Sequence, residues 1–345
     1  MTEKSKSVGQ KLSMVRLVIG VVLALLVLLP SIPTIYRAMT NPKADSWEEG
    51  SVPVKAPSSH ASQRPITDKV MSYGSACDGG DTGACYELGV LYDLGRGTSK
   101  DPVRSAKYYQ KACDKGAFPA CINLAVQYDE GRGVAKDPAR TASLYKKACS
   151  SNDKRARKDA CFSLALMHAG GLGIPKDTTK AVSSYSRACD ASHPVGCFKL
   201  AQHYDLAESA SYDPEKAVRL YQAACKGSFW EGCTHHALAL EHGRGVSKDL
   251  AQAAGMFQYA CEKEEPKACM NIGRLFRYKH PGQSVGYFQK ACANGQHQAC
   301  LDLGEMYEQG EGVPEDIPGA KSLYDKACVA GLEKACISAK RLRGQ

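Results

Sequence analysis

Sixteen cysteines in a chain of 345 residues are the side chains of this sequence best able to do chemistry. They form eight close pairs, and in seven of the pairs the second cysteine follows the first by 8 residues. The pairs are Cys77 with Cys85, Cys113 with Cys121, Cys149 with Cys161, Cys189 with Cys197, Cys225 with Cys233, Cys261 with Cys269, Cys292 with Cys300, and Cys328 with Cys336. An even number of regularly paired cysteines is typical of a disulfide framework in an oxidising compartment. We therefore predict eight disulfides.

Other uses of the thiols fit the spacing less well. Structural zinc sites usually separate neighbouring cysteine ligands by two to four residues, and the sequence contains neither C-x-x-C nor the C-x-x-C-H of covalent haem attachment. His235 and His236 lie beside Cys233, but a metal site there requires Cys233 to be unpaired or a further ligand. We predict no metal and no cofactor.

Catalytic motifs are also scarce. One S-x-x-K tetrad runs from Ser151 to Lys154, but the S-D-N and K-T-G elements of serine β-lactam enzymes are missing. We expect this tetrad to lie in a basic insertion, residues 154–158, away from a helix start. That insertion is either a solvated loop or a surface for an acidic partner or lipid headgroups. No catalytic residue is predicted.

The elements that position the cysteines repeat along the chain, and most successive pairs are spaced by 36 residues. A strict period of this kind is typical of a repeat array rather than one globular core. In the unit that starts at Cys121, the residues Cys121, Leu124, Ala125 and Tyr128 form one helical stripe. Glycines end this helix A, and an Asp-Pro step then begins a second helix, helix B. We predict seven such helix pairs, with a half-unit before Cys77 and a last helix after Cys336.

The unit resembles a known repeat. Its pattern A-C-x-x-L-G/A-x-x-Y-x-x-G-x-G-V-x-K-D, followed by A-x-x-Y-x-K-A-C, is similar to the Sel-one-like repeat (SLR), and the two cysteines per unit resemble the Helicobacter cysteine-rich protein family. The resemblance covers Asp68 to about Arg343 and implies an all-α, right-handed α/α superhelical solenoid, related to tetratricopeptide repeats. It also implies a protein-binding scaffold. Cysteine-rich mitochondrial SLR proteins that assist respiratory-complex assembly are a second similar group.

The resemblance further implies where a partner binds, because helix A lines the concave face in this family. Side chains soon after the second cysteine of each pair, the helix-A cysteine, are then expected to project into the groove. The predicted groove residues are Glu87, Asn123, Gln127, Lys199, His203, His235, Asn271, Arg274 and Asp302. They differ from repeat to repeat on a constant frame, which favours recognition of a protein or peptide.

The N-terminal region has a different character. Residues 17–36 form an apolar run of about 20 residues, enough for one membrane span. Basic residues concentrate in the preceding tail, residues 1–16, so the positive-inside rule predicts a cytoplasmic N-terminus and periplasmic repeats. A cleaved signal peptide and secretion are the alternative. Residues 37–65 are predicted to be a flexible Pro/Ser linker, and residues 66–345 the solenoid.

Charge and composition narrow the function. The formal net charge is +9, but acidic residues are interspersed and no concentrated basic face is evident, so nucleic-acid binding is not expected. The sequence thus predicts a membrane-tethered, extracytoplasmic scaffold for protein interactions. Two alternatives stay open: a weakly hydrolytic β-lactam or peptidoglycan-fragment binder, which the family resemblance implies, and a haem- or metal-linked respiratory assembly factor.

Overall fold

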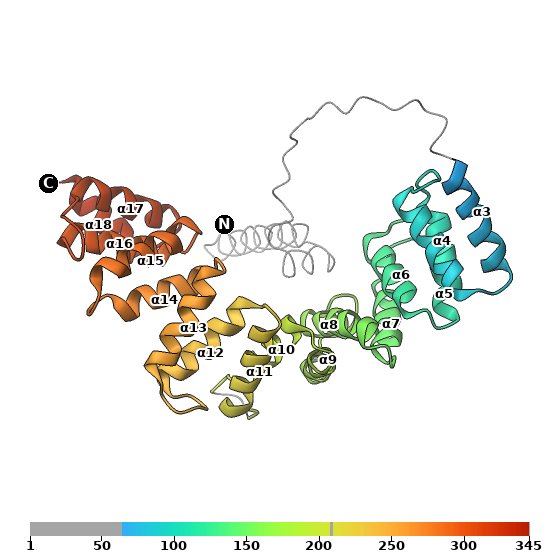
Figure 1. Ribbon diagram of the computed structural model, residues 1–345, viewed down its shortest axis with the longest axis horizontal. Helices are drawn as coiled ribbons and strands as arrows, with labels where there is room; N and C mark the ends of the chain where they lie inside the picture. The colour runs from blue at the N-terminus through green and yellow to red at the C-terminus, as the bar shows by residue number, and fades with distance from the viewer. Residues whose placement is uncertain (1–63, 208–209, 345) are drawn as a thin grey trace, which may run out of the picture. The chain divides into compact units, whose positions relative to one another are not determined.

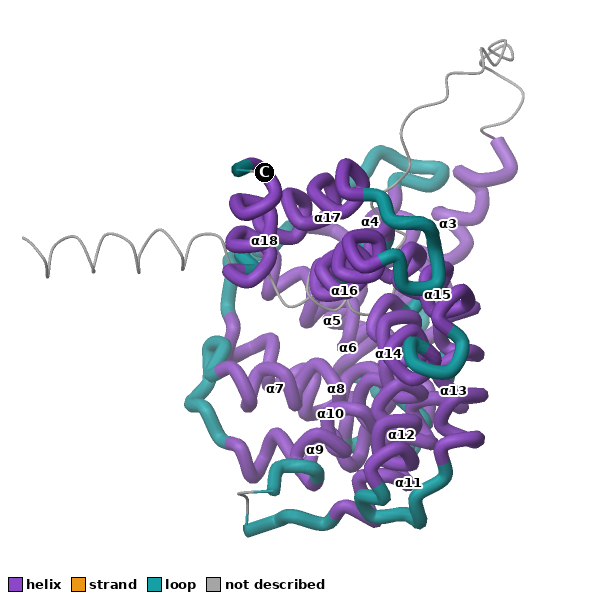
Figure 2. Tube along the Cα trace, turned by 90° about the vertical axis from the view of Figure 1, so that its left-hand side faces the viewer, coloured by secondary structure: helices purple, strands orange, loops and turns teal. Residues whose placement is uncertain are grey.

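The computed structural model describes residues 64–207 and 210–344, and every regular element in this part of the chain is an α-helix (Figures 1 and 2). The predicted membrane span, residues 17–36, lies outside the described residues, as do the basic tail and nearly all of the linker. Within the described ranges, none of the helices combines the length and the apolar character needed to span a bilayer.

The chain divides into two compact units, and the boundary in the sequence falls between Ala181 and Val182, within α9. The described helices of the first unit are α3 (Arg64–Asp78), α4 (Thr82–Leu94), α5 (Pro102–Asp114), α6 (Phe118–Glu130), α7 (Pro138–Cys149) and α8 (Lys154–Gly170). Helix α9 (Thr178–Asp190) contains the boundary. In this unit α4/α5 and α6/α7 form helix A/helix B pairs, α8 is a further helix A, and α3 is the predicted half-unit before them.

The second unit continues the same alternation. Its helices are α10 (Pro194–Tyr204), α11 (Pro214–Lys226), α12 (Trp230–His242), α13 (Leu250–Glu262), α14 (Pro266–Phe276), α15 (Pro281–Ala293), α16 (His297–Gln309), α17 (Ile317–Val329) and α18 (Glu333–Arg343). The even-numbered helices are helices A and the odd-numbered ones are helices B. Helix α18 is the predicted last helix after the final pair.

Local signals set the helix boundaries. Asp137 caps α7, because its side chain accepts the backbone N–H of Arg140 at 2.9 Å, and Pro138 occupies the first turn. Helix α6 ends at Gly131, whose φ of 72° is the left-handed conformation that glycine adopts without strain. The same aspartate cap begins α5, α11, α13 and α17, and the same glycine stop ends α4, α8, α12 and α16.

The basic insertion is helical, which corrects the expectation of a loop. Helix α8 is 17 residues long and begins at Lys154 itself. Asp153 makes this possible, because its side chain accepts the backbone N–H groups of Arg155 and Ala156 at the open end of the helix. The tetrad that ends at Lys154 therefore does meet a helix start.

All eight predicted cysteine pairs are disulfides, and the described residues contain no free cysteine. The bonds join Cys77 to Cys85, Cys113 to Cys121, Cys149 to Cys161, Cys189 to Cys197, Cys225 to Cys233, Cys261 to Cys269, Cys292 to Cys300, and Cys328 to Cys336. Each links a helix that ends one repeat to the helix A of the next. Cα–Cα distances of 4.6–4.8 Å lie within the ordinary range for this bond.

Most of the cysteines are buried in the core, and Cys189, Cys225 and Cys328 of the helices B are half-buried. The helix-A members of seven bridges are buried, namely Cys85, Cys121, Cys161, Cys197, Cys233, Cys269 and Cys300. Only the last helix departs from this, because Cys336 of α18 is half-buried. In the loop-entropy account, each closed loop of this length stabilises the folded chain by about 2.5 kcal/mol. The bridges are thus structural elements of the junctions, and a partner meets other side chains.

The core of each repeat is an aromatic ring from helix B seated on small residues of helix A. Phe288 of α15 and Tyr324 of α17 are almost completely buried. A Cβ atom added to Gly273 would lie 2.9 Å from the ring of Phe288, and one added to Gly304 would lie 2.7 Å from Tyr324. The paired helices can approach closely because these positions carry no side chain.

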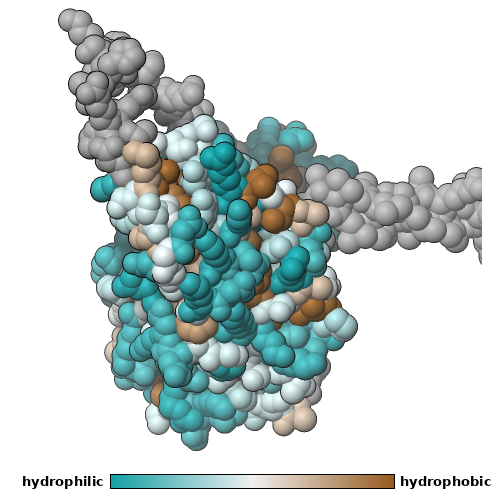
Figure 3. All heavy atoms as spheres, turned by 90° about the vertical axis from the view of Figure 1, so that its right-hand side faces the viewer, coloured by the Kyte–Doolittle hydropathy of each residue, from teal (hydrophilic) through white to brown (hydrophobic). Residues whose placement is uncertain are grey.

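The surface seen in Figure 3 is mainly hydrophilic, and its hydrophobic side chains gather in small separate patches. Scattered patches of this size are ordinary for a protein surface. Recognition on the described helices is therefore to be sought in particular side chains and pockets.

Candidate functional site

Polar and charged side chains of the helices A form the surface that carries the predicted groove residues. We call it the helix-A face and define it by positions +2, +5, +6, +8 and +11 after each helix-A cysteine. Three of the ion pairs that join one repeat to the next on this face follow one pattern: Asp93–Arg132, Asp205–Arg244 and Arg277–Glu311. In each pair a +8 residue meets a +11 residue of the following repeat, and in the third pair the charges are reversed.

The predicted groove residues divide into accessible and enclosed positions. Glu87 and Arg274 are exposed, and Asn123, Lys199, His203, His235 and Asn271 are half-buried. Gln127 is fully buried and donates from Nε2 to the hydroxyl of Ser105 at 3.0 Å, so it contributes to the packing between helices. Asp302 is only 8% exposed.

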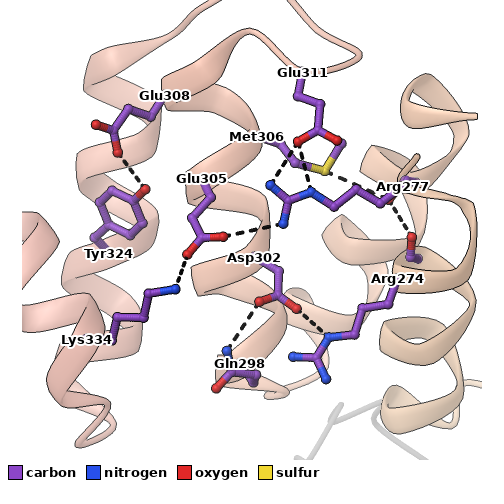
Figure 4. A network of polar contacts seen from close by, with 12 residues as sticks. Arg274, Arg277, Gln298, Asp302, Glu305, Met306, Glu308, Glu311, Tyr324 and Lys334 are labelled. Atoms are coloured by element: carbon purple, nitrogen blue, oxygen red, sulfur yellow. Dashed lines mark hydrogen bonds and ion pairs between the residues drawn. The ribbon is translucent and has the colours of Figure 1, made fainter. Parts of the chain in front are cut away.

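Arg274 and Asp302 are brought together, with 2.7 Å between the guanidinium Nε and the carboxylate Oδ2. Figure 4 shows that the acidic side chains of α16 reach both neighbouring repeats. Glu305 accepts from Arg277 at 3.4 Å on one side and from Lys334 at 2.7 Å on the other. Arg277 also contacts Glu311 at 2.8 Å. This end of the helix-A face is thus a network of satisfied charges.

Sequence reasoning missed the +8/+11 pairs, although their spacing was a usable signal. Asp93 and Arg132 are 39 residues apart, as are Asp205 and Arg244. The Arg277–Glu311 separation is 34, because that unit is shorter. A separation of one repeat plus three residues, carrying opposite charges, identifies residues that stack across a junction.

Buried tyrosines of helix B donate hydrogen bonds to two of the acidic residues on the helix-A face. Tyr221 donates its hydroxyl to Asp205 at 3.1 Å, and Tyr324 donates to Glu308 at 2.7 Å. Burial, together with the neighbouring carboxylate, raises the pKa of both phenols above the ordinary range. The tyrosines therefore stay protonated donors, and they fix the carboxylates in place.

His235 belongs to an aromatic cluster and lacks the surroundings of a metal ligand. Its ring centroid lies 4.9 Å from that of Tyr221 and 5.2 Å from that of Phe198. Burial lowers the pKa of His235, with nearby charges as smaller influences, so the neutral imidazole is favoured. Cys233 is bonded to Cys225 and cannot supply a thiolate. No cluster of three or more metal-ligating side chains occurs among the described residues.

The S-x-x-K tetrad is placed unlike a catalytic nucleophile. Ser151 is 5% exposed and donates its hydroxyl to the carbonyl oxygen of Asp153 at 3.3 Å. Lys154 is exposed at the first position of α8. Ser151 thus serves the turn before α8.

A pocket of about 230 Å³ opens on the helix-A face of the first unit. It is lined by Tyr86, Val90, Asp93, Leu94, Tyr109, Asn123, Val126 and Arg132. These side chains come from α4, α5, α6 and the turn after α6. Among the predicted groove residues, Asn123 is the one that lines this pocket.

The fold and this face define a class: an all-α solenoid of tandem helix pairs whose junctions are cross-linked. The Sel1 repeat matches residues 82–116, 119–153, 158–193, 194–229, 230–264, 266–296 and 297–332, so the chain belongs to the Sel1 repeat family. Proteins of this family are generally scaffolds for protein–protein interaction. No curated protein matches the sequence significantly.

Two solved structures, one from Escherichia coli and one from Oxalobacter formigenes, have a similar fold. A protective antigen of uropathogenic Escherichia coli with an SLR fold is 25% identical with a TM-score of 0.73, and the match covers 80% of this chain and 60% of the antigen. This chain therefore spans less than two thirds of that protein's length. A Sel1 repeat protein of Oxalobacter formigenes is 25% identical with a TM-score of 0.65, covering 81% of each chain. Cysteine rich protein B of Helicobacter pylori is 25% identical over 47% of this chain and 93% of its own, with a TM-score of 0.21.

Proposed function

We propose that the protein is an extracytoplasmic, membrane-tethered scaffold that binds a protein partner through its helix-A face. The observation that carries this proposal is chemical variation on a constant frame. Position +2 holds an acid at Glu87, an amide at Asn123, a base at Lys199 and an imidazole at His235, while a disulfide recurs at the start of each of these helices. A repeat frame with one variable face is how solenoid proteins recognise an extended surface.

Accessible side chains of the helix-A face suit an extended polypeptide. An amide side chain both donates and accepts, so Asn123 and Asn271 can each hold a peptide unit of a partner. Both are half-buried, with part of the side chain open to solvent. Glu87 in the first unit and Lys199 in the second carry opposite charges at the same repeat position, so each unit can select a partner segment by charge.

The tether and the location are part of the proposal. Eight disulfides are typical of a protein outside the cytoplasm. The apolar run at residues 17–36 supplies the length of one membrane span. Alkaline extraction of membranes tests the anchor, and the intact mass of the mature protein separates it from a cleaved signal peptide. A mature chain that lacks residues 1–36 overturns the tether.

Site-specific photo-crosslinking in the exporting cell tests partner binding. A photoreactive residue at position 199 or 271 should give a discrete adduct with one protein. The same residue at position 107 or 222, both exposed on helices B, is the matched control and should give none. Glu87→Lys and Lys199→Glu should weaken the adduct that forms at position 271 more than Lys107→Glu does. Equal adducts at helix-A and helix-B positions would overturn the proposal.

A further inference from the structure

The pocket between α4, α5 and α6 is of a size for one side chain. Its volume of about 230 Å³ is below the ~300–1,000 Å³ of sites for drug-sized ligands. Tyr109 forms the floor and is 1% exposed, whereas Leu94 stands at the rim and is 52% exposed. The walls are mixed, with valines on α4 and α6 and the amide of Asn123.

The second unit carries the same frame with a different side chain beside the aromatic pair. Tyr86, Tyr109 and Asn123 occupy the repeat positions that Phe198, Tyr221 and His235 occupy in the second unit. There, the imidazole of His235 lies against both rings, 4.9 Å from Tyr221 and 5.2 Å from Phe198. In the first unit Asn123 is shorter than a histidine and has no ring, and a pocket is found beside it. The chain itself therefore shows which group fits between two such aromatic side chains: a flat ring.

The ring that fits in the second unit is uncharged, because burial lowers the pKa of His235. Contacts of this kind between rings stabilise a complex beyond the effect of the apolar area that they bury. Tyr86 is half-buried and lies 6.1 Å from Tyr109, so its exposed part is available to an incoming ring.

The charged side chains around the pocket restrict which residues of a partner can flank the bound ring. Arg132 pairs with Asp93 and with Glu130, so two carboxylates stand against one guanidinium. Asp93 and Arg132 are themselves pocket walls. The net charge of Arg132, Asp93 and Glu130 together is therefore negative. A partner segment with acidic residues beside its aromatic residue would be repelled.

We propose that this pocket binds one aromatic side chain from an extended, uncharged or basic segment of a protein partner. The inference rests on the proposed function, and it names both the anchor of the partner and the place where it is held. The anchor enters between α4 and α6, above Tyr109. The amide of Asn123 already hydrogen-bonds with Tyr109, and its remaining hydrogen-bonding groups can bind the partner's backbone.

Short peptides test the chemistry directly on the full chain with its disulfides intact. Ac-Lys-Tyr-Lys-NH2 is the probe, Ac-Lys-Leu-Lys-NH2 removes the ring, and Ac-Glu-Tyr-Glu-NH2 reverses the flanking charge. Dissociation constants from ligand-observed NMR should favour the first peptide by about fivefold or more over each of the others. Equal affinity for the tyrosine and leucine peptides overturns the aromatic assignment, and stronger binding of the acidic peptide overturns the charge argument.

Two variants place the peptide in the pocket. Asn123→His supplies the ring that the second unit carries and should weaken binding of Ac-Lys-Tyr-Lys-NH2 about fivefold or more. Leu94→Ala removes an exposed wall and should also weaken it, without a burden on folding. Leu206→Ala is the matched control, because Leu206 holds the same repeat position in the second unit and is 60% exposed. Binding unchanged in both Asn123→His and Leu94→Ala overturns the site.

The same variants separate this inference from the proposed function. If Asn123→His leaves the photo-crosslinked partner in place while Glu87→Lys and Lys199→Glu remove it, the helix-A face binds a partner and the aromatic anchor is wrong. If no helix-A variant changes the adduct, the proposed function fails as well.

Discussion

Arg244 reaches back across one repeat junction to Asp205, with 3.3 Å between its Nη1 and the carboxylate Oδ1. The other oxygen of Asp205 accepts the hydroxyl of buried Tyr221 at 3.1 Å. One carboxylate thus links α10, α11 and the turn after α12. Asp93 and Arg132 form the same ion pair in the first unit.

Asp205→Asn should lower the stability of the second unit by about 1 kcal/mol, because it removes the charge that Arg244 and Tyr221 share. Thermal unfolding followed by circular dichroism measures the change. Asp190→Asn is the control, since Asp190 is exposed at the end of α9, and should stay within about 0.5 kcal/mol of the wild type. Equal effects of the two substitutions would contradict a role for the linkage.

Gly133 should not tolerate a side chain. Its φ is +75°, and an added Cβ would overlap the carbonyl oxygen of Pro102 in the preceding repeat. Gly116 also has a positive φ, +92°, but nothing lies within 4 Å of a Cβ added there. Gly116→Ala should therefore cost only the backbone strain of about 1–2 kcal/mol. Gly133→Ala should cost about 1–3 kcal/mol more, because the junction is overpacked.

Chemical denaturation of the two glycine variants separates strain from crowding. Similar loss in both would mean that the Pro102 contact relaxes freely and that the junction is not tightly packed.

Acidification should lower the stability of the second unit through His235 and His236. Burial lowers the folded-state pKa of His235 and His236 below the ordinary value of 6.5. As the pH falls below about 6.5, the unfolded chain binds protons that the folded chain does not, so stability falls. Above that pH the two histidines are neutral in both the folded and the unfolded chain, so they do not make the stability depend on pH. His235→Asn with His236→Asn should flatten the dependence of the unfolding midpoint between about pH 7 and 5.5. A slope unchanged in the double variant contradicts this origin.

Removing one bridge should loosen one junction. Cys225→Ser with Cys233→Ser should cost the second unit about 2.5 kcal/mol by the loop-entropy account. Because the contacts in a solenoid are between neighbours, amide exchange should rise mainly in α11 and α12. Uniform loss of protection across the unit would contradict a local role.

Alkylation of the exported wild-type protein without reduction should detect almost no free thiol.

The frame could be predicted from the sequence, because its signals are local. The stripe from Cys121 to Tyr128 predicts a helix, Gly131 predicts its end, and Asp137 with Pro138 predicts the next start. The close cysteine pairs predict their own partners, since each bridges a short turn. The structure confirms each of these.

Accessibility on the helix-A face was harder to predict, because it depends on side chains of the neighbouring repeat. Asp302 stands at the same repeat position as Asn123, yet Arg274 lies over it. Gln127 is enclosed because Ser105 of the preceding helix B binds its amide. The helix start at Lys154 was missed because four of its first five residues are charged, and the cap from Asp153 decides the outcome.

The disulfides connect each cysteine to its nearest partner in sequence, at separations of 8 or 12 residues. Repeats that enter an oxidising compartment in their order along the chain therefore present both members of a pair before the next pair arrives. Bonds made in order of emergence are the native ones, and oxidation can keep pace with translocation without later reshuffling.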